Sequence, residues 1–369
     1  MTTLAMTARN ALELPVRGLD WARVWWFRAL GPFAKPLVRS RELRIAVFGV
    51  VAVLSALTMT ATIPLYLLAI GPLVLGIPHV GSDLRYLVVR PKLHRRWWLV
   101  VPAIGLYAAH AWTYDARYGI GVTLLAVLFA RGRHHGRRAL VLALAAAWMG
   151  AAFYDGHLTA LVFAHFHNFA AIAFLWAWRP QRASKLHFVL LGAITLAALT
   201  VMLGGLDPIV QRLGGFVPLV GRTGIEWNLA LYAPGIPAPW GARLVLLFAF
   251  AQSIHYGIWL RLIPEDDRAR ETPRTWAATL SALRQDVGWP VALVIFAVAL
   301  GVAVWATIDL FAARLGYLRM VLFHGYMETA ALALLFIEAR PLRSVDDVAA
   351  ATGPAGASEA TPSAALTAA

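Results

Sequence analysis

Cysteine is absent from all 369 residues, and only 14% of the residues are charged. Without cysteine the chain can form no disulfide and offers no thiolate, so any metal must bind through histidine, carboxylate or backbone oxygen. The chain also lacks the charged and then apolar start of a secretory signal peptide, which predicts that no leader is removed. No segment recurs at a fixed period, so a transporter built from two repeated halves gains no support.

Apolar residues are what the sequence has in excess. They make up 60% of the chain, which includes 15 tryptophans. A water-soluble protein of this length could not bury so much apolar surface, so the composition predicts an all-α, polytopic membrane helical bundle. The net charge of +14 comes from arginines clustered between apolar runs. We interpret this pattern as membrane topology and expect no nucleic-acid partner.

The apolar runs predict about ten transmembrane helices. We place them at 43–62, 65–85, 97–113, 118–130, 139–153, 157–178, 186–206, 242–260, 289–310 and 317–339. Most of these lengths suit a bilayer core of about 30 Å. Basic loops follow the even-numbered helices, whereas the other connections are poor in Lys and Arg. The positive-inside rule therefore places both termini in the cytoplasm and predicts a multi-pass protein of a bacterial-type inner membrane.

Three segments flank or interrupt the predicted transmembrane domain, which spans 43–343. Residues 1–42 carry Trp21, Trp25 and Arg28 at helical spacing. This favours an amphipathic helix at the cytoplasmic surface, with an ordered soluble tail as the alternative. Residues 205–241 are rich in Gly and Pro yet apolar, and either dip into the membrane or form an exposed loop with one surface helix. Residues 344–369 have the composition of a disordered tail.

The second predicted helix contains Gly76-Ile77-Pro78-His79, with an acid at Asp83. Helical spacing puts His79 and Asp83 on one face. An imidazole and a carboxylate in lipid are costly unless they pair with each other, bind an ion or line a wet cavity. The pair is therefore either a hydrogen bond that locks two helices together or part of a functional site.

Further histidines recur inside later apolar segments, which favours the functional interpretation. An acid again follows a histidine by four residues at His324 and Glu328, and such a pair can bind or orient one metal ion. The candidate metal ligands are His79, His165, His255 and His324. The candidate neighbours or alternative ligands are Asp83, His167, Tyr256 and Glu328.

His165 and His167 cannot easily share a metal ion. Two residues apart on a helix, they point about 200° from each other. His157 and Asn168 lie near the face of His165, so the spacing favours His165 as the ligand and His167 as a packing residue. Counted along the helices, His324 lies deepest in the membrane, so its place in the same site is the least secure.

Four neutral imidazoles backed by carboxylates suit iron(II), or less specifically zinc or copper. Two alternatives remain open from the residues alone. One is a haem- or quinone-binding membrane protein, with two of the histidines as axial haem ligands. The other is a proton-coupled transporter or channel that uses His79, Asp83, His255 and Glu328.

The stretch Gly76-Ile77-Pro78-His79 with Asp83 resembles the first motif of the Brp/Blh family, membrane enzymes that cleave β-carotene to retinal with iron and dioxygen. The resemblance covers this motif, the all-helical architecture and the presence of later histidine-bearing helices. It implies that His79 is an iron ligand with Asp83 as its acidic neighbour. Val80 and Leu84 stand where the family usually has Gly and a second His.

Together these observations predict an Fe(2+) oxygenase that acts on a carotenoid or another apolar membrane lipid. The metal would activate dioxygen, and neutral imidazoles would leave coordination positions open. The competing transporter predicts a continuous aqueous path along the same polar residues. The residues do not indicate an oligomeric state.

Overall fold

The computed structural model describes residues 3–132, 134–177, 185–216, 223–267 and 271–339, and this part of the chain is helical without any β-strand. In chain order the helices are α1 (Thr3–Ala29), η1 (Gly31–Phe33), α2 (Ala34–Arg39), α3 (Arg41–Thr62), α4 (Pro64–Gly71), η2 (Pro72–Gly76), α5 (Ile77–Asp83), η3 (Leu84–Val89), η4 (Leu93–Arg95), α6 (Trp97–Thr113), α7 (Ala116–Phe129), α8 (His135–Tyr154), α9 (Gly156–Ala177), α10 (Leu186–Met202), α11 (Asp207–Leu213), α12 (Ile225–Tyr232), α13 (Trp240–Gly257), η6 (Ile258–Leu262), α14 (Ile263–Asp266), α15 (Trp276–Ile308), α16 (Leu310–Val321) and α17 (Phe323–Ile337).

Seven helices of the described chain are long and apolar enough to cross a membrane, as in a multi-pass membrane protein. They are Arg41–Thr62, Pro64–Val89, His135–Tyr154, Gly156–Ala177, Trp240–Asp266, Trp276–Ile308 and Leu310–Ile337. An eighth forms if α10 and α11, bent by 66°, count as one span. The predicted count of about ten is therefore not confirmed. Helices α6 and α7 have 17 and 14 residues, and at 1.5 Å per residue they reach only about 26 and about 21 Å.

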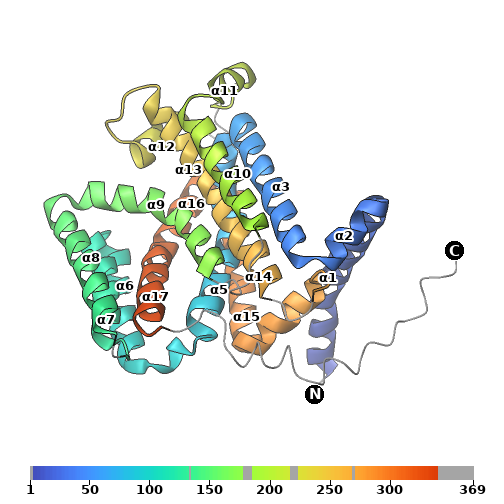
Figure 1. Cartoon of the computed structure of the whole chain (residues 1–369), viewed down its shortest axis with the longest axis horizontal. Coiled ribbons are helices and arrows are strands. Elements are labelled where there is room, and N and C mark those ends of the chain that lie inside the picture. The colour runs from blue at the N-terminus through green and yellow to red at the C-terminus, as the bar shows by residue number, and fades with distance from the viewer. Residues whose placement is uncertain (1–2, 133, 178–184, 217–222, 268–270, 340–369) are drawn as a thin grey trace.

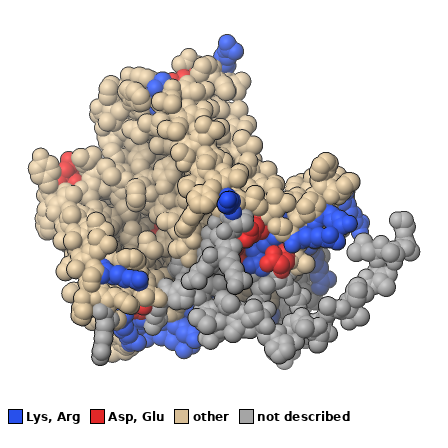
Figure 2. All heavy atoms as spheres, viewed as in Figure 1, with Lys and Arg blue, Asp and Glu red and all other residues tan. Residues whose placement is uncertain are grey.

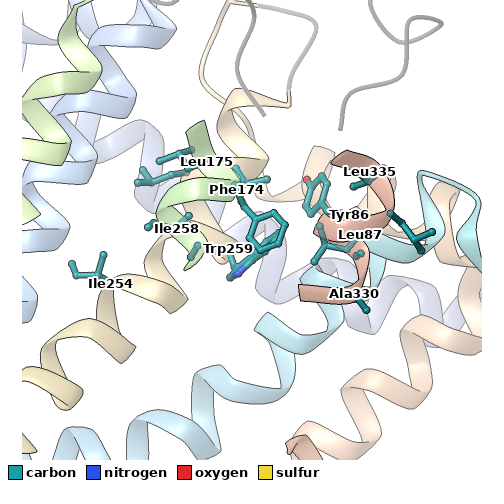
Figure 3. Close-up of a cluster of buried hydrophobic side chains, with 14 of the residues drawn as sticks. Tyr86, Leu87, Phe174, Leu175, Ile254, Ile258, Trp259, Ala330 and Leu335 are labelled. Atoms are coloured by element: carbon teal, nitrogen blue, oxygen red, sulfur yellow. The ribbon is translucent and has the colours of Figure 1, made fainter. Parts of the chain in front are cut away.

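The helices form two groups that meet around the centre of the molecule (Figure 1). In one group α3, α10 and α13 contact one another, and in the other α7 packs against α6, α8 and α17. Helix α9 contacts both α8 and α13, and so links the groups. One apolar core runs through both, and Figure 3 shows Phe174 beside Trp259 and Tyr86 beside Leu335 within it. Trp259 has no exposed surface, and its ring lies 5.4 Å from that of Phe174.

Charged side chains lie mainly at one end of the bundle. Figure 2 shows most of the visible Lys and Arg along the lower edge, while the flanks are almost free of charge. Arg44 and Glu265 form a buried ion pair at this end, 2.8 Å apart. This distribution agrees with a membrane-spanning bundle that has its basic loops on one side of the bilayer. The cytoplasmic placement of the two termini stays a prediction.

The second membrane helix is not a uniform α-helix. Two π-helical segments, η2 and η3, lie on either side of the short α5, which carries His79 and Asp83. Pro72 and Pro78 lack an N–H donor, so the regular i to i−4 hydrogen bonds cannot continue through them. A third π-helical segment, η6, begins just after His255 and Tyr256. Such segments occur often at functional sites.

The segments outside the bundle differ in part from the expectations. Residues 1–42 contain α1, η1 and α2, and Trp21 and Trp25 of α1 are exposed. The described part of 205–241 contains two short helices, α11 and α12, rather than one. Helix α15 begins before the predicted 289–310 because it continues through a kink at Gly288, which has φ 78°. The expected tail, 344–369, lies outside the described residues.

Candidate metal centre

Four histidines from four different helices converge in the middle of the bundle. His79 comes from α5, His167 from α9, His255 from α13 and His324 from α17. The ring centroids of His79 lie 5.1 Å from His255 and 4.9 Å from His324. Those of His167 lie 5.1 Å from His255 and 4.9 Å from His324. The four rings therefore form a closed ring of neighbours, which we call the four-histidine cluster.

Backbone carbonyls fix the orientation of three of these rings. Nδ1 of His79 lies 2.6 Å from the carbonyl oxygen of Gly76. The same contact, to the residue three positions earlier, is 3.1 Å for His167 and 2.6 Å for His324. A carbonyl oxygen can only accept, so Nδ1 must carry the hydrogen in each case. In a neutral ring this leaves the lone pair on Nε2, the atom that would bind a metal.

Two of these Nε2 atoms face each other. His167 Nε2 and His324 Nε2 are 3.1 Å apart. In the neutral tautomers both atoms are acceptors, so their contact is repulsive unless a proton or a metal ion lies between the rings. Nitrogens that each lie about 2.0–2.1 Å from one shared ion stand about 3 Å from each other. The observed separation fits two ligands of one metal.

Two buried carboxylates lie beside the Nε2 atoms of the other two histidines. His79 Nε2 lies 3.6 Å from an Asp83 oxygen, and His255 Nε2 lies 3.6 Å from a Glu328 oxygen. These distances are too long for hydrogen bonds. All four side chains are at most 1% exposed.

Several polar atoms of this group lack a hydrogen-bond partner within the described chain: Nε2 of His79, Nε2 of His255 and both oxygens of Asp83 and of Glu328. The indole of Trp259 faces Glu328 without completing a hydrogen bond. Buried polar atoms normally find a partner, because leaving one unpaired costs about 1–3 kcal/mol. A cation at this point would give a partner to the nitrogens of His79 and His255 and to the Asp83 carboxylate.

The donor atoms are close enough to share that cation. One ligand atom each from His79, Asp83, His255 and His324 can be chosen so that all lie within 4.8 Å of one another. His167 adds its Nε2 beside that of His324. Nitrogen and carboxylate donors without sulfur suit iron(II), zinc or copper(II) rather than a thiolate-bound metal.

His165 does not join this cluster, contrary to the preference that the sequence suggested. Its Nε2 lies 2.8 Å from the backbone oxygen of Tyr232, and its ring contacts Phe248. The opposite face of α9 carries His167 to the cluster instead, as the 200° separation requires. The Asn168 amide donates to the carbonyl of Ala164, one turn earlier on the same helix.

The structure adds Tyr317, a neighbour of the motif that sequence patterns missed. Tyr256 lies beside the cluster as expected, with its ring 4.7 Å from that of His79. The hydroxyl of Tyr317 occupies the space where a side chain at Gly76 would begin, 2.0 Å from the position of a Cβ. Gly76 is thus needed for close packing, and its carbonyl is also the acceptor that orients His79.

One side of the cluster is more open than the rest. His167 and His324 are half-buried, whereas His79 and His255 have almost no exposed surface. Aromatic rings pack next to this open side. Tyr326 stacks on Phe163 at 4.4 Å and on Trp148 at 5.6 Å, and Phe163 also contacts His167. An apolar molecule would therefore meet aromatic surface beside His167.

The fold and the site define a class: an all-helical, multi-pass membrane protein with a buried cluster of histidines and carboxylates that could hold a metal ion. No family model, curated protein or solved structure matches the chain.

Proposed function

We propose that this chain is a membrane-embedded oxygenase whose four-histidine cluster binds iron(II) and which acts on a carotenoid or another apolar lipid. The observation that carries the proposal is the pair of facing nitrogens, His167 Nε2 and His324 Nε2, 3.1 Å apart with both Nδ1 atoms committed to backbone carbonyls. Iron(II) bound there would supply the redox chemistry needed to activate dioxygen.

The protein residues have distinct roles in this proposal. The carbonyls of Gly76, Ala164 and Val321 hold three imidazoles in the tautomer that presents Nε2 to the centre. Asp83 and Glu328 lie beside the Nε2 atoms of His79 and His255, where their negative charge would balance a divalent cation and where Asp83 could bind the ion itself. Their burial keeps water from that side of the centre.

The apolar substrate is supported by the surroundings and by the resemblance. The open side of the cluster, at His167 and His324, is next to the stacked rings of Phe163 and Tyr326. Such surface suits a long unsaturated hydrocarbon better than a polar solute. The motif Gly76-Ile77-Pro78-His79 with Asp83 resembles that of the carotene-cleaving Brp/Blh enzymes, which is the reason to test β-carotene first.

The two alternative functions fit the geometry less well. Two axial haem ligands need a porphyrin between them, but the rings of His167 and His324 are in edge contact, 4.9 Å between centroids. A proton-coupled transporter needs its carboxylates to reach water at some stage, and Asp83 and Glu328 have no exposed surface in this conformation.

The substrate proposal is tested by expressing the chain in a bacterium that accumulates β-carotene. We expect the colour to fade and retinal to form with the wild type, and neither change with His79→Ala at equal protein level. Retention of colour without retinal by the wild type would reject the carotenoid proposal. The same culture extracts can then be searched for other oxidised lipids, which would leave the oxygenase proposal standing.

A further inference from the structure

A second site lies at the charged end of the bundle, away from the four-histidine cluster. It is a cavity of about 330 Å³ where α1 crosses α3, η6 and the start of α15. Two arginines and four aromatic residues line it: Arg23, Trp26, Phe27, Phe48, Arg261 and Trp276. In Figure 1 α1 comes close to the beginnings of α3 and α15 at the lower right, and Figure 2 shows blue and red side chains gathered at the same corner.

Arg23 has a carboxylate neighbour that is already engaged. Asp20 accepts hydrogen bonds from the backbone N–H groups of Trp276 and Ala277, at 2.8 and 3.1 Å, and so caps the beginning of α15. Arg23 Nε stands 3.5 Å from Asp20 and makes no hydrogen bond within the described chain. The cap leaves the charge of Arg23 only partly balanced.

Arg261, on the opposite wall of the cavity, also has a carboxylate neighbour that is already engaged. Its neighbour Glu265, 3.3 Å away, also accepts two hydrogen bonds from Arg44, at 2.9 and 2.8 Å. The Arg44–Glu265 pair is fully buried, whereas the Arg261 side chain is 32% exposed at the cavity. In these contacts Arg23 has only the engaged Asp20 as its partner, Arg261 shares Glu265 with Arg44, and the positive end of the α15 dipole adds to the positive charge at the cavity.

The walls also restrict the kind of anion that fits. Arg261 lies over the ring of Phe48, 5.2 Å from its centroid, and Trp26 contacts the same ring. Trp21 and Trp25 are exposed on the same helix, as is typical of helices at a membrane surface. A small soluble anion would leave these aromatic walls uncovered, whereas a lipid would cover them with its acyl chains.

We propose that this cavity binds the phosphate group of an anionic phospholipid, with Arg23 and Arg261 on the headgroup and the aromatic walls against the upper part of the acyl chains. Guanidinium groups bind phosphate through paired, charge-assisted hydrogen bonds. Anionic lipids are also enriched in the cytoplasmic leaflet, and they attract basic protein segments at the membrane surface. The bound lipid would fasten α1 to α3 and α15.

The test measures lipid binding to the purified full chain by native mass spectrometry in detergent. The probes are phosphatidylglycerol, phosphatidylcholine and inorganic phosphate. The variants are Arg23→Gln and Arg261→Gln, with Arg28→Gln as a control that removes an exposed arginine from the same helix. Arg23→Gln leaves the Glu265 contacts intact, so it remains informative if Arg261→Gln destabilises the fold.

We expect the wild type and Arg28→Gln to bind phosphatidylglycerol equally, in preference to phosphatidylcholine. Each cavity variant should bind it about tenfold more weakly, as the loss of a charged hydrogen bond predicts. Equal binding by Arg23→Gln and Arg28→Gln would overturn the proposal. Inorganic phosphate that binds as tightly as phosphatidylglycerol would show a simple anion site and would overturn the lipid assignment.

Discussion

Two buried polar regions of this molecule differ in how fully their hydrogen bonds are satisfied. At the charged end, the Arg44 guanidinium donates hydrogen bonds from Nε and Nη2 to the Glu265 carboxylate. Its Nη1 donates to the backbone carbonyls of Leu37 and Val38. In the four-histidine cluster, His79 Nε2 and both Glu328 oxygens have no hydrogen-bond partner within the described chain. The Arg44–Glu265 pair is complete without any ligand, whereas the histidine cluster is not. The difference separates polar residues that hold the fold from those that await a ligand.

The largest effect on stability should come from Glu265→Gln. The substitution leaves the fully buried Arg44 without its counter-charge, and breaking a buried ion pair costs about 3–5 kcal/mol. Unfolding of the purified protein in detergent, followed by circular dichroism, measures the loss. Glu226→Gln, at an exposed position of α12, is the control and should change stability little. Equal stability of the two variants would mean that the Arg44 pair does not hold the helices.

Two histidines on one helix should differ sharply in metal binding. His167→Ala removes a nitrogen that faces His324 at 3.1 Å, whereas His165→Ala removes only a bond to the Tyr232 carbonyl. Loss of residues that merely orient a ligand lowers metal affinity about 10–100-fold, so loss of a ligand should cost at least that much. The metal affinity of both variants is measured by competition with a chelator. A larger loss in His165→Ala than in His167→Ala would reverse the assignment.

Gly76→Ala should destabilise the protein near His79, because the added methyl group clashes with a neighbouring side chain. A Cβ at this position would lie 2.0 Å from the Tyr317 hydroxyl, and overpacking of this kind costs about 1–3 kcal/mol. Gly105→Ala in α6, where a Cβ meets nothing within 4 Å, makes the same chemical change without a clash. Unfolding curves of both variants provide the comparison. If the two substitutions have the same effect on stability, the contact with Tyr317 does not require glycine at position 76.

The smallest effect on stability should come from Glu328→Gln in metal-free protein. Glu328 is as buried as Glu265, but its oxygens have no hydrogen-bond partner within the described chain, so the substitution breaks no hydrogen bond. The free energy of unfolding should therefore change by no more than about 1 kcal/mol. The chemical change matches Glu265→Gln, and the same unfolding assay applies. A loss as large as that of Glu265→Gln would show that Glu328 has a structural partner and would remove the contrast between the two regions.

The sequence predicted the all-helical membrane architecture because apolar runs and helical spacing are local properties. It also singled out His79, His255 and His324, which the structure brings together, because polar residues inside apolar segments are conspicuous. The choice between His165 and His167 depends on the rotation of α9, which is set by packing against Tyr232 and Phe248 far along the chain.

Other features depend on long-range contacts that no local pattern records. Tyr317 meets Gly76 across two helices, and the π-helical segments beside His79 and His255 follow from how those helices bend. The count of ten spans was not confirmed because α6 and α7, although apolar, are short. Apolar composition alone does not separate a helix that crosses the bilayer from one that covers the bundle.

The central claim, that the cluster is a metal site, is tested most directly by the metal content of protein purified without chelators. Inductively coupled plasma mass spectrometry on the wild type, His79→Ala, His255→Ala and the His165→Ala control gives the comparison. We expect nearly stoichiometric iron in the wild type and in His165→Ala, and little in the two cluster variants. Equally low metal in all four proteins, also after reconstitution with iron(II), zinc or copper, would contradict the claim.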